Sequence, residues 1–188
     1  MLPNLRDFFV SYGSYHHNKV NKIIHFIFIP QIVFSLLCMA KHWSSTRFHF
    51  MGQELDYTFF FLLAVLLAYI KIDFISGVIS SVVYLGLYYL SNIIWLQYKL
   101  AGQVDQHFKI FLIQHIVSWL VQFIGHGVFE KRSPALLDNI LLTLVAPDFV
   151  ILEFLFMFGY KKDVQEECYK RIVANIKAFH ESKAKKAK

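Results

Sequence analysis

The sequence predicts an all-α, polytopic membrane protein, and three observations support this fold class. Of the 188 residues, 56% are hydrophobic and only 17% are charged, and the mean hydropathy is +0.46. A soluble domain of this length needs a charged exterior around its core, and these charges are too few and too unevenly placed to supply one. The hydrophobic residues also gather in runs that are long enough to cross a bilayer.

Four of these runs can each form a transmembrane helix, because about 20 helical residues cross a hydrocarbon core of about 30 Å. They cover approximately residues 23–39, 57–75, 74–96 and 108–124. The second and third runs nearly touch around Lys71-Ile72-Asp73. We therefore expect them to form a tight helical hairpin.

A fifth run, residues 140–158, is interrupted by Ala146-Pro147-Asp148 and carries Glu153. Proline removes a helical hydrogen bond and clashes with the preceding turn, and the two pieces on either side are each too short to span. We expect a broken, re-entrant hairpin that enters and leaves on one side. A single kinked span is the alternative.

The distribution of Lys and Arg predicts the orientation. With four alternating spans, the N-terminus, the Lys71 turn, the 125–139 connection and, if the fifth run re-enters, the tail share one side. That side carries fifteen of the nineteen basic residues, so the positive-inside rule makes it cytosolic. We divide the chain into one integral membrane domain, residues 1–160, and a lysine-rich cytosolic tail, residues 161–188.

The tail ends in KKAK, with lysines third and fourth from the end. This looks like the dilysine retrieval signal of endoplasmic-reticulum membrane proteins, and an ordinary solvated basic tail is the alternative. Nucleic acid is not an expected partner, because no basic face is interleaved with stacking aromatics. Cys38 and Cys168 form neither a disulfide framework nor a zinc motif. Residues 1–22 lack the apolar segment of a cleavable signal peptide.

Four histidines gather at the predicted cytosolic face. His16 and His17 precede the first span, His25 lies just inside it, and His126 lies just beyond the fourth span. A first span that starts on one side and a fourth that ends there bring all four imidazoles to the same face. Asn18 or Asn21 can cap the helix that contains His25.

Such a cluster favours a metal site over four separate structural histidines, which remain the alternative. Neutral imidazole suits iron, zinc, copper or nickel, and ionisable groups at membrane depth are usually functional. No cysteine is near, which argues against structural zinc and iron–sulfur clusters. The chain has no HxxHH or HxxxH box of the di-iron desaturases, so a mononuclear or otherwise distinct iron site fits better.

The remaining histidines receive no role. His115, Trp119, Gln122 and His126 share one stripe of the fourth helix, but His115 is about 16 Å from His126 along that helix. It cannot share a metal with His126, and we expect it to hydrogen-bond to another helix. The others are His42, His49 and His107 on the opposite side and His180 in the tail.

Glu130, Lys131 and Arg132 follow His126 closely. Lys131 and Arg132 are either a positive-inside anchor or a clamp for a carboxylate, since arginine offers a bidentate fork to a planar anion. Glu130 can orient a ligating histidine, complete a metal shell or pair with Lys131. The residue pattern alone leaves these alternatives open.

Three segments together resemble the endoplasmic-reticulum 2-hydroxy fatty acid dioxygenase family: YHHNKVNKIIHFIFIP, WLVQFIGHGVFEKRSPALLDN and APDFVILEFLF. The likeness covers about residues 15–162, apart from the loop near 40–56. The resemblance implies an Fe(2+)-dependent enzyme that uses O2 to shorten a 2-hydroxy fatty acid by one carbon in phytosphingosine breakdown. Its partners would be that fatty acid, O2 and membrane lipid.

Position by position, the resemblance implicates His16, His25 and His126, with His17, as metal ligands. His126 and Glu130 would be catalytic, and Lys131 and Arg132 would bind substrate. Two positions depart from the family pattern, because Lys19 and Ser133 stand where proline and arginine are common.

Two other functions compete with the enzyme. One is a non-catalytic scaffold or lipid-binding protein, which would bind no metal. The other is a transporter, since Pro147 beside Asp148 and Glu153 resembles the discontinuous helices of carriers. The lack of repeat symmetry and the massing of titratable groups on one face argue against a transporter.

Overall fold

The computed structural model describes residues 5–43, 48–50, 53–134 and 140–186. The all-α class is confirmed, and the β structure within these residues is one short antiparallel hairpin. The elements, in chain order, are α1 (Leu5–Gly13), α2 (Lys19–Ala40), β1 (Phe48–Phe50), β2 (Gln53–Leu55), α3 (Tyr57–Ile72), α4 (Phe74–Leu100), α5 (Val104–Ile124), the π-helix η1 (Gly125–Glu130), α6 (Ile140–Met157) and α7 (Lys162–Lys186).

Three helices are long and apolar enough to cross a membrane: α2, α4, and α5 continued by η1. The helices α6 and α7 meet at a bend of 115° and bring the number of candidate spans to four if the pair counts as one. By helix composition the chain is a multi-pass membrane protein. The second predicted span is the shorter helix α3, whose 16 residues cover about 24 Å.

The predicted hairpin around residue 72 is confirmed. Helix α3 ends at Ile72 and α4 begins at Phe74, with Asp73 as the residue between them. The Asp73 carboxylate accepts a hydrogen bond from the Ser76 backbone N–H at 3.0 Å and so caps α4. Capping by aspartate satisfies a backbone donor that the first helical turn leaves unpaired.

The predicted break at Pro147 is wrong, because α6 is continuous from Ile140 to Met157 and the sharp bend follows it. Side chains of α4 hold the helix at the proline and at the residue that follows it. The Tyr84 hydroxyl donates to the Pro147 carbonyl at 3.2 Å, and the Ser76 and Ser80 hydroxyls donate to the Asp148 carboxylate at 3.2 and 2.8 Å. These buried contacts offset the cost of proline inside a helix, which is about 3 kcal/mol.

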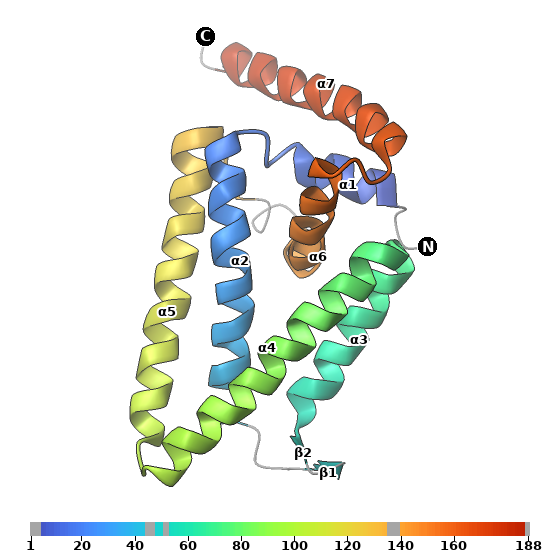
Figure 1. Ribbon diagram of the computed structural model, residues 1–188. Coiled ribbons are helices and arrows are strands. Elements are labelled where there is room, and N and C mark those ends of the chain that lie inside the picture. The colour runs from blue at the N-terminus through green and yellow to red at the C-terminus, as the bar shows by residue number, and fades with distance from the viewer. Residues whose placement is uncertain (1–4, 44–47, 51–52, 135–139, 187–188) are drawn as a thin grey trace.

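The elements divide between the two ends of the bundle (Figure 1). At the upper end in that view, α1 packs against α6, and α7 lies across both; a shared core includes Phe9, Phe149 and Cys168. An ion pair between Lys161 and Asp73 ties the α6–α7 turn to the α3–α4 turn. The N-terminal segment, the α3–α4 turn, η1 and α7 therefore gather at one end, as the alternation of spans predicts.

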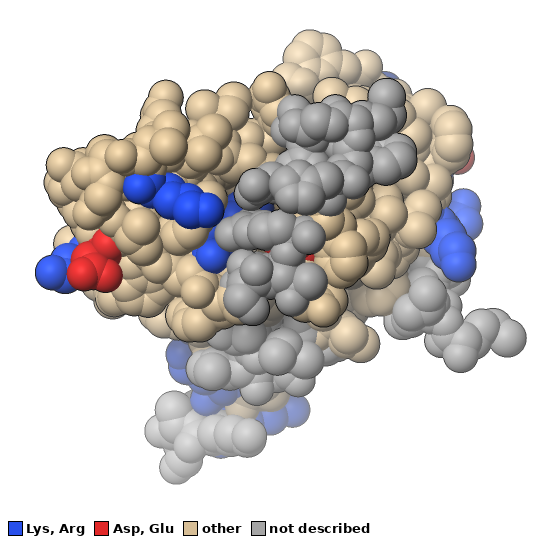
Figure 2. Space-filling model, turned by 90° about the horizontal axis from the view of Figure 1, so that it is seen from below, with Lys and Arg blue, Asp and Glu red and all other residues tan. Residues whose placement is uncertain are grey.

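The opposite end holds the β-hairpin and the α4–α5 turn. A fully buried ion pair joins Lys41 and Asp56 there at 2.9 Å. Figure 2 views the molecule from this end, and the surface that it colours consists mostly of residues other than Lys, Arg, Asp and Glu. The paucity of basic residues at this end agrees with the uneven distribution of Lys and Arg along the chain.

Candidate metal centre

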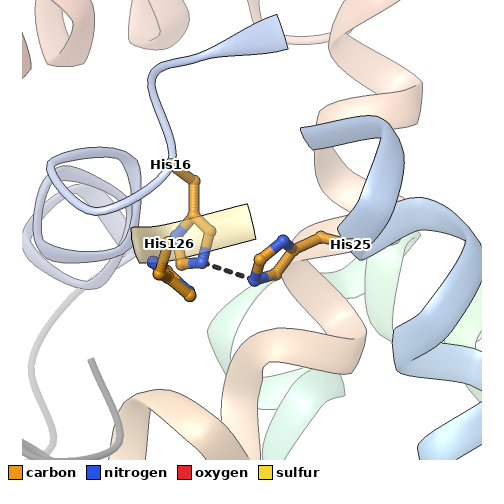
Figure 3. Close-up of side chains that lie close together, drawn as sticks. All are labelled: His16, His25 and His126. Carbon is orange, nitrogen blue, oxygen red and sulfur yellow. Dashed lines mark hydrogen bonds between the residues drawn. The ribbon is translucent and has the colours of Figure 1, made fainter. Parts of the chain in front are cut away.

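Three of the four predicted histidines converge at the end of the bundle that carries α1 (Figure 3). His16 lies in the turn after α1, His25 in the second turn of α2, and His126 at the second position of η1. One ring nitrogen of each lies within 4.8 Å of the others. Each of the three side chains is only 4% exposed.

Backbone carbonyls fix the tautomers of two of these rings. His16 Nδ1 donates to the Tyr12 carbonyl at 2.7 Å, and His25 Nδ1 donates to the Asn21 carbonyl at 2.8 Å. A carbonyl oxygen can only accept, so the proton of each neutral ring is on Nδ1. The two Nε2 atoms, which face each other at 2.9 Å, therefore both present lone pairs.

Two lone pairs that face each other at this distance repel, and a cation between or beside them, either a proton or a metal ion, relieves the repulsion. Burial, together with the neighbouring imidazoles of His25 and His126, lowers the pKa of His16 well below its usual value, so an extra proton on His16 is unfavourable. A metal ion satisfies both nitrogens instead. Two imidazole nitrogens bound at right angles to one ion, each at about 2.1 Å, lie about 3 Å apart.

His126 supplies a third ring at 4.9 Å, between centroids, from both His16 and His25. Its Nδ1 is buried and has no hydrogen-bond partner among the residues that the structure describes. Three neutral imidazoles without a cysteine form a donor set that suits iron as well as zinc, copper or nickel. The residues present therefore fit a metal ion.

Glu130 holds the N-terminal segment against η1. Its Oε1 accepts hydrogen bonds from the backbone N–H groups of His17 and Asn18, both at 2.8 Å, and from the side chain of Asn21 at 3.0 Å. Asn18 in turn caps α2 through the Val20 N–H. The predicted alternatives were that Glu130 orients a ligating histidine, completes a metal shell or pairs with Lys131; the contacts seen are with the backbone of His17 and Asn18 and with Asn21.

The other predicted site residues lie outside the triad. His17 is exposed, and its ring lies 6.0 Å from that of Tyr169. The Arg132 guanidinium lies over Tyr15, 3.6 Å from the ring centroid, and donates to the Ser14 carbonyl. Lys131 is exposed. Lys131 and Arg132 border a shallow groove on the surface that shares Phe123 and Pro134 with the cavity described next.

An apolar cavity of about 320 Å³ runs from the triad into the bundle. It is bordered by single faces of α2, α3 and α5, with part of α6. On α2 these residues are His25, Ile29, Ile32, Val33, Leu36, Leu37 and Ala40; on α3 they are Thr58, Phe61, Leu62, Val65 and Tyr69; on α5 they are His115, Trp119, Gln122 and Phe123.

The cavity opens on the side of the helical bundle, which is the surface that lipid surrounds in a membrane-spanning protein. Leu36, Phe61, Phe123 and Leu144 line it and are still 49%, 63%, 42% and 45% exposed. They belong to four different helices, α2, α3, α5 and α6. An apolar molecule dissolved in the bilayer can therefore reach the cavity between these helices without passing through water.

The expectation for His115 is confirmed. Its Nδ1 lies 2.9 Å from the Ser35 hydroxyl of α2, and its Nε2 accepts from the Trp119 indole at 3.0 Å. At the opposite end of the bundle His42 and His107 form their own pair, with Nε2 and Nδ1 3.0 Å apart.

Sequence analysis missed Tyr12. Its ring stacks on His16 with centroids 4.0 Å apart, and its carbonyl fixes the His16 tautomer. Its position four residues before His16 could have indicated this contact, because residues four apart lie on one side of a helical turn. Gln122 was placed on the stripe of the fourth span but received no role.

Comparisons with known proteins agree with this site. A family model described as "2-hydroxy-palmitic acid dioxygenase Mpo1-like" matches residues 2–158. The chain is 37% identical over 163 residues to the 2-hydroxy-palmitic acid dioxygenase MPO1 of Saccharomyces cerevisiae, and the alignment covers 85% of this chain and 84% of the yeast protein. No solved structure matches the chain.

Proposed function

Because the chain belongs to the Mpo1-like family of 2-hydroxy-palmitic acid dioxygenases, we propose that it is an iron(II)-dependent dioxygenase that shortens 2-hydroxy fatty acids by one carbon. An example is the conversion of 2-hydroxypalmitate to pentadecanoate during sphingoid-base degradation. The observation that carries the proposal is the pair of Nε2 atoms 2.9 Å apart whose rings already donate through Nδ1.

In this proposal His16, His25 and His126 hold the iron. Bound there, iron supplies the activation of O2 and a binding site for the carboxylate and hydroxyl oxygens of the substrate. The protein keeps the three rings neutral and fixed, and the cavity excludes water from the reacting carbon. Glu130 acts by holding the segment that carries His16.

The overall reaction needs no second reductant. A 2-hydroxy acid and one O2 give the acid shorter by one carbon, CO2 and one water. The bond between the carboxyl carbon and the hydroxyl-bearing carbon breaks, and the latter becomes the new carboxyl group. The two substrate carbons lose four electrons in total, and one O2 gains four, so we expect one O2 consumed for each product molecule.

The shape of the cavity supports a proposed position for the substrate. The acyl chain enters between the helices and lies along the apolar faces of α2 and α3, with its head group at the histidines. Lys131 and Arg132, at the adjoining groove, attract the carboxylate to the opening, as basic groups at a membrane surface attract anions. We place the protein in the endoplasmic-reticulum membrane with this end towards the cytosol.

The test of the activity is a reaction of purified protein with 2-hydroxypalmitate, ferrous iron and O2, followed by analysis of the fatty acids. Pentadecanoate is the expected product, and His126→Ala abolishes it. His180→Ala, which changes an exposed histidine of α7, is the control and keeps the rate. Absence of the shortened acid from the wild-type reaction would contradict the proposal.

Metal binding is tested separately by measuring the iron content of variants at two adjacent histidines, His16 and His17. His16→Ala loses the bound iron because it removes an Nε2 of the triad. His17→Ala keeps it, since that ring lies at Tyr169. A loss of iron in both variants would assign His17 a ligand role in addition to the three buried rings.

A further inference from the structure

Gln122 carries a buried side-chain amide that lines the cavity. Its side chain is 3% exposed, and neither Oε1 nor Nε2 has a hydrogen-bond partner among the described residues. A buried amide without partners destabilises the fold, because it has lost its hydrogen bonds to water and gained none. Such a group is expected where a ligand completes its hydrogen bonds.

The amide belongs to the wall of the cavity beside the triad. Gln122 lies one turn before His126 and on the same face of the α5–η1 segment, which is the spacing of neighbours on a helix. Both residues line the cavity together with His16 and His25. A fatty acid head group bound at the histidines would therefore lie beside the Gln122 amide.

The other buried polar side chains of this cavity wall are engaged within the protein. The Tyr69 hydroxyl donates to the Leu144 carbonyl at 2.5 Å, and the Tyr84 hydroxyl donates to the Pro147 carbonyl at 3.2 Å. Among the buried residues of the described cavity wall outside the triad, Gln122 is the one whose side-chain N and O atoms both lack a hydrogen-bond partner. They are therefore available to a ligand.

We propose that Gln122 recognises the 2-hydroxy acid head group and makes the protein select 2-hydroxylated over unsubstituted fatty acids; this inference rests on the proposed function. The amide Nε2 donates to a carboxylate oxygen, and Oε1 accepts the hydrogen of the 2-hydroxyl group. An unsubstituted acid offers no donor at that carbon and leaves Oε1 unpaired. Sites built to bind a substrate hydroxyl reject analogues that lack it for this reason.

The experiment compares the binding of 2-hydroxypalmitate and palmitate to iron-loaded protein without O2. Gln122→Met has nearly the same shape but no amide. We expect it to reduce the preference for the hydroxylated acid at least about tenfold, with the iron content unchanged. Gln114→Met is the matched control, because Gln114 lies on α5 outside the cavity wall, and it keeps the wild-type preference.

A second readout separates recognition from a structural role. Because Gln122→Met removes an unpaired buried amide, it raises the Tm of the substrate-free protein by about 3 °C. A structural hydrogen bond at Gln122 would instead lower the Tm or prevent folding, and either result overturns the inference.

The outcomes distinguish the two proposals. If the wild-type protein neither binds nor shortens 2-hydroxypalmitate, the proposed function fails. If the wild-type protein does both, and Gln122→Met keeps the wild-type preference within about twofold, only the role of Gln122 is overturned.

Discussion

At the scale of single residues, the metal centre depends on the close approach of η1 to α2. A Cβ atom at Gly125 would overlap the Asn21 side chain. Asn21 is fully buried and cannot turn away without losing its hydrogen bond to Glu130. Gly127, two residues further along, would meet no described atom within 4 Å. Of the two glycines that flank His126, therefore, Gly125 is the one that permits close packing.

We therefore predict that Gly125→Ala separates His126 from the other two rings. Displacing a residue that supports metal ligands typically costs 10–100-fold in metal affinity, so the iron affinity should fall at least about tenfold. Gly127→Ala is the control and should bind iron as the wild type does. Equal iron affinity in both variants, measured by competition with a chelator, would show that the contact at Gly125 is not needed.

Glu130 permits a second prediction at this scale. Glu130→Gln keeps an Oε1 acceptor for the three donors from His17, Asn18 and Asn21, whereas Glu130→Ala removes it. If Glu130 positions the segment, the glutamine variant keeps most of the iron affinity and activity, and the alanine variant loses at least about tenfold in iron affinity. A glutamine variant that binds iron normally but is inactive would instead make Glu130 a proton-transfer group.

At the scale of elements, Asp73 links the start of α4 to the α6–α7 turn through three contacts. It caps α4, pairs with Lys161 and accepts from the Tyr160 hydroxyl at 3.0 Å. Burial raises the pKa of the Asp73 carboxyl, but the hydrogen bonds from Lys161, from the Ser76 N–H and from Tyr160 outweigh burial and hold the pKa below its usual value. A carboxyl whose pKa is lower in the folded state stabilises the fold above its unfolded pKa, and this contribution is lost as the pH falls through the folded pKa.

We predict that Asp73→Asn and Asp73→Ala both lower the free energy of unfolding at pH 7 and both weaken its dependence on pH in the acid range. Asparagine still caps the helix, so the alanine variant should be about 1 kcal/mol less stable than the asparagine variant. Thermal unfolding in detergent between neutral and acid pH measures both effects. Wild-type stability of Asp73→Asn at pH 7 would show that the ion pair contributes nothing.

At the scale of the whole molecule, the length of the cavity would limit the acyl chain of the proposed substrate. His25 and Ala40 stand at opposite ends of the α2 face that lines it, and fifteen residues of helix between them correspond to about 22 Å. The extended acyl chain of 2-hydroxypalmitate is of about this length, so it reaches Ala40 when its head group lies at the histidines. The buried Lys41–Asp56 pair follows directly after Ala40.

Filling the far end should therefore shorten the preferred substrate. We predict that Ala40→Phe lowers kcat/KM for 2-hydroxypalmitate at least about tenfold more than for 2-hydroxylaurate, because each misplaced methylene costs about 1–3 kcal/mol. Ala64→Phe, on an exposed part of α3, is the control. An unchanged ratio of the two substrates in Ala40→Phe would mean that the acyl chain does not reach Ala40.

The orientation of the whole molecule can be tested with new glycosylation sites, since the chain contains no Asn-x-Ser/Thr sequence. Ser44→Asn creates one in the sequence between α2 and α3, and His180→Asn creates one in α7. If the end that carries the triad faces the cytosol, only the Ser44 variant gains a glycan in microsomes. A glycan on the His180 variant alone would reverse the orientation.

Sequence patterns were sufficient to predict the fold class, the hairpin at Asp73, the convergence of His16, His25 and His126, and the hydrogen bond of His115 to another helix. These features follow from local hydropathy, from helical periodicity and from the alternation of spans across a bilayer. Each of them can be read from the order of residues without knowledge of distant contacts. The same patterns also placed His17 in the cluster, whereas its ring lies against Tyr169. Proline was misjudged at residue 147 because its local cost is clear from sequence, whereas the contacts from α4 that offset it are not.

The surroundings of Glu130, Arg132 and Gln122 are visible only in the folded chain. Glu130 finds its partners 113 positions away, at His17, and 109 positions away, at Asn21, and Arg132 rests on Tyr15 and Phe179 from both ends of the chain. The Gln122 amide has no hydrogen-bond partner among the described residues. A hydrogen bond, or its lack, depends on which distant residues packing brings within about 3 Å, and local sequence patterns do not contain that information.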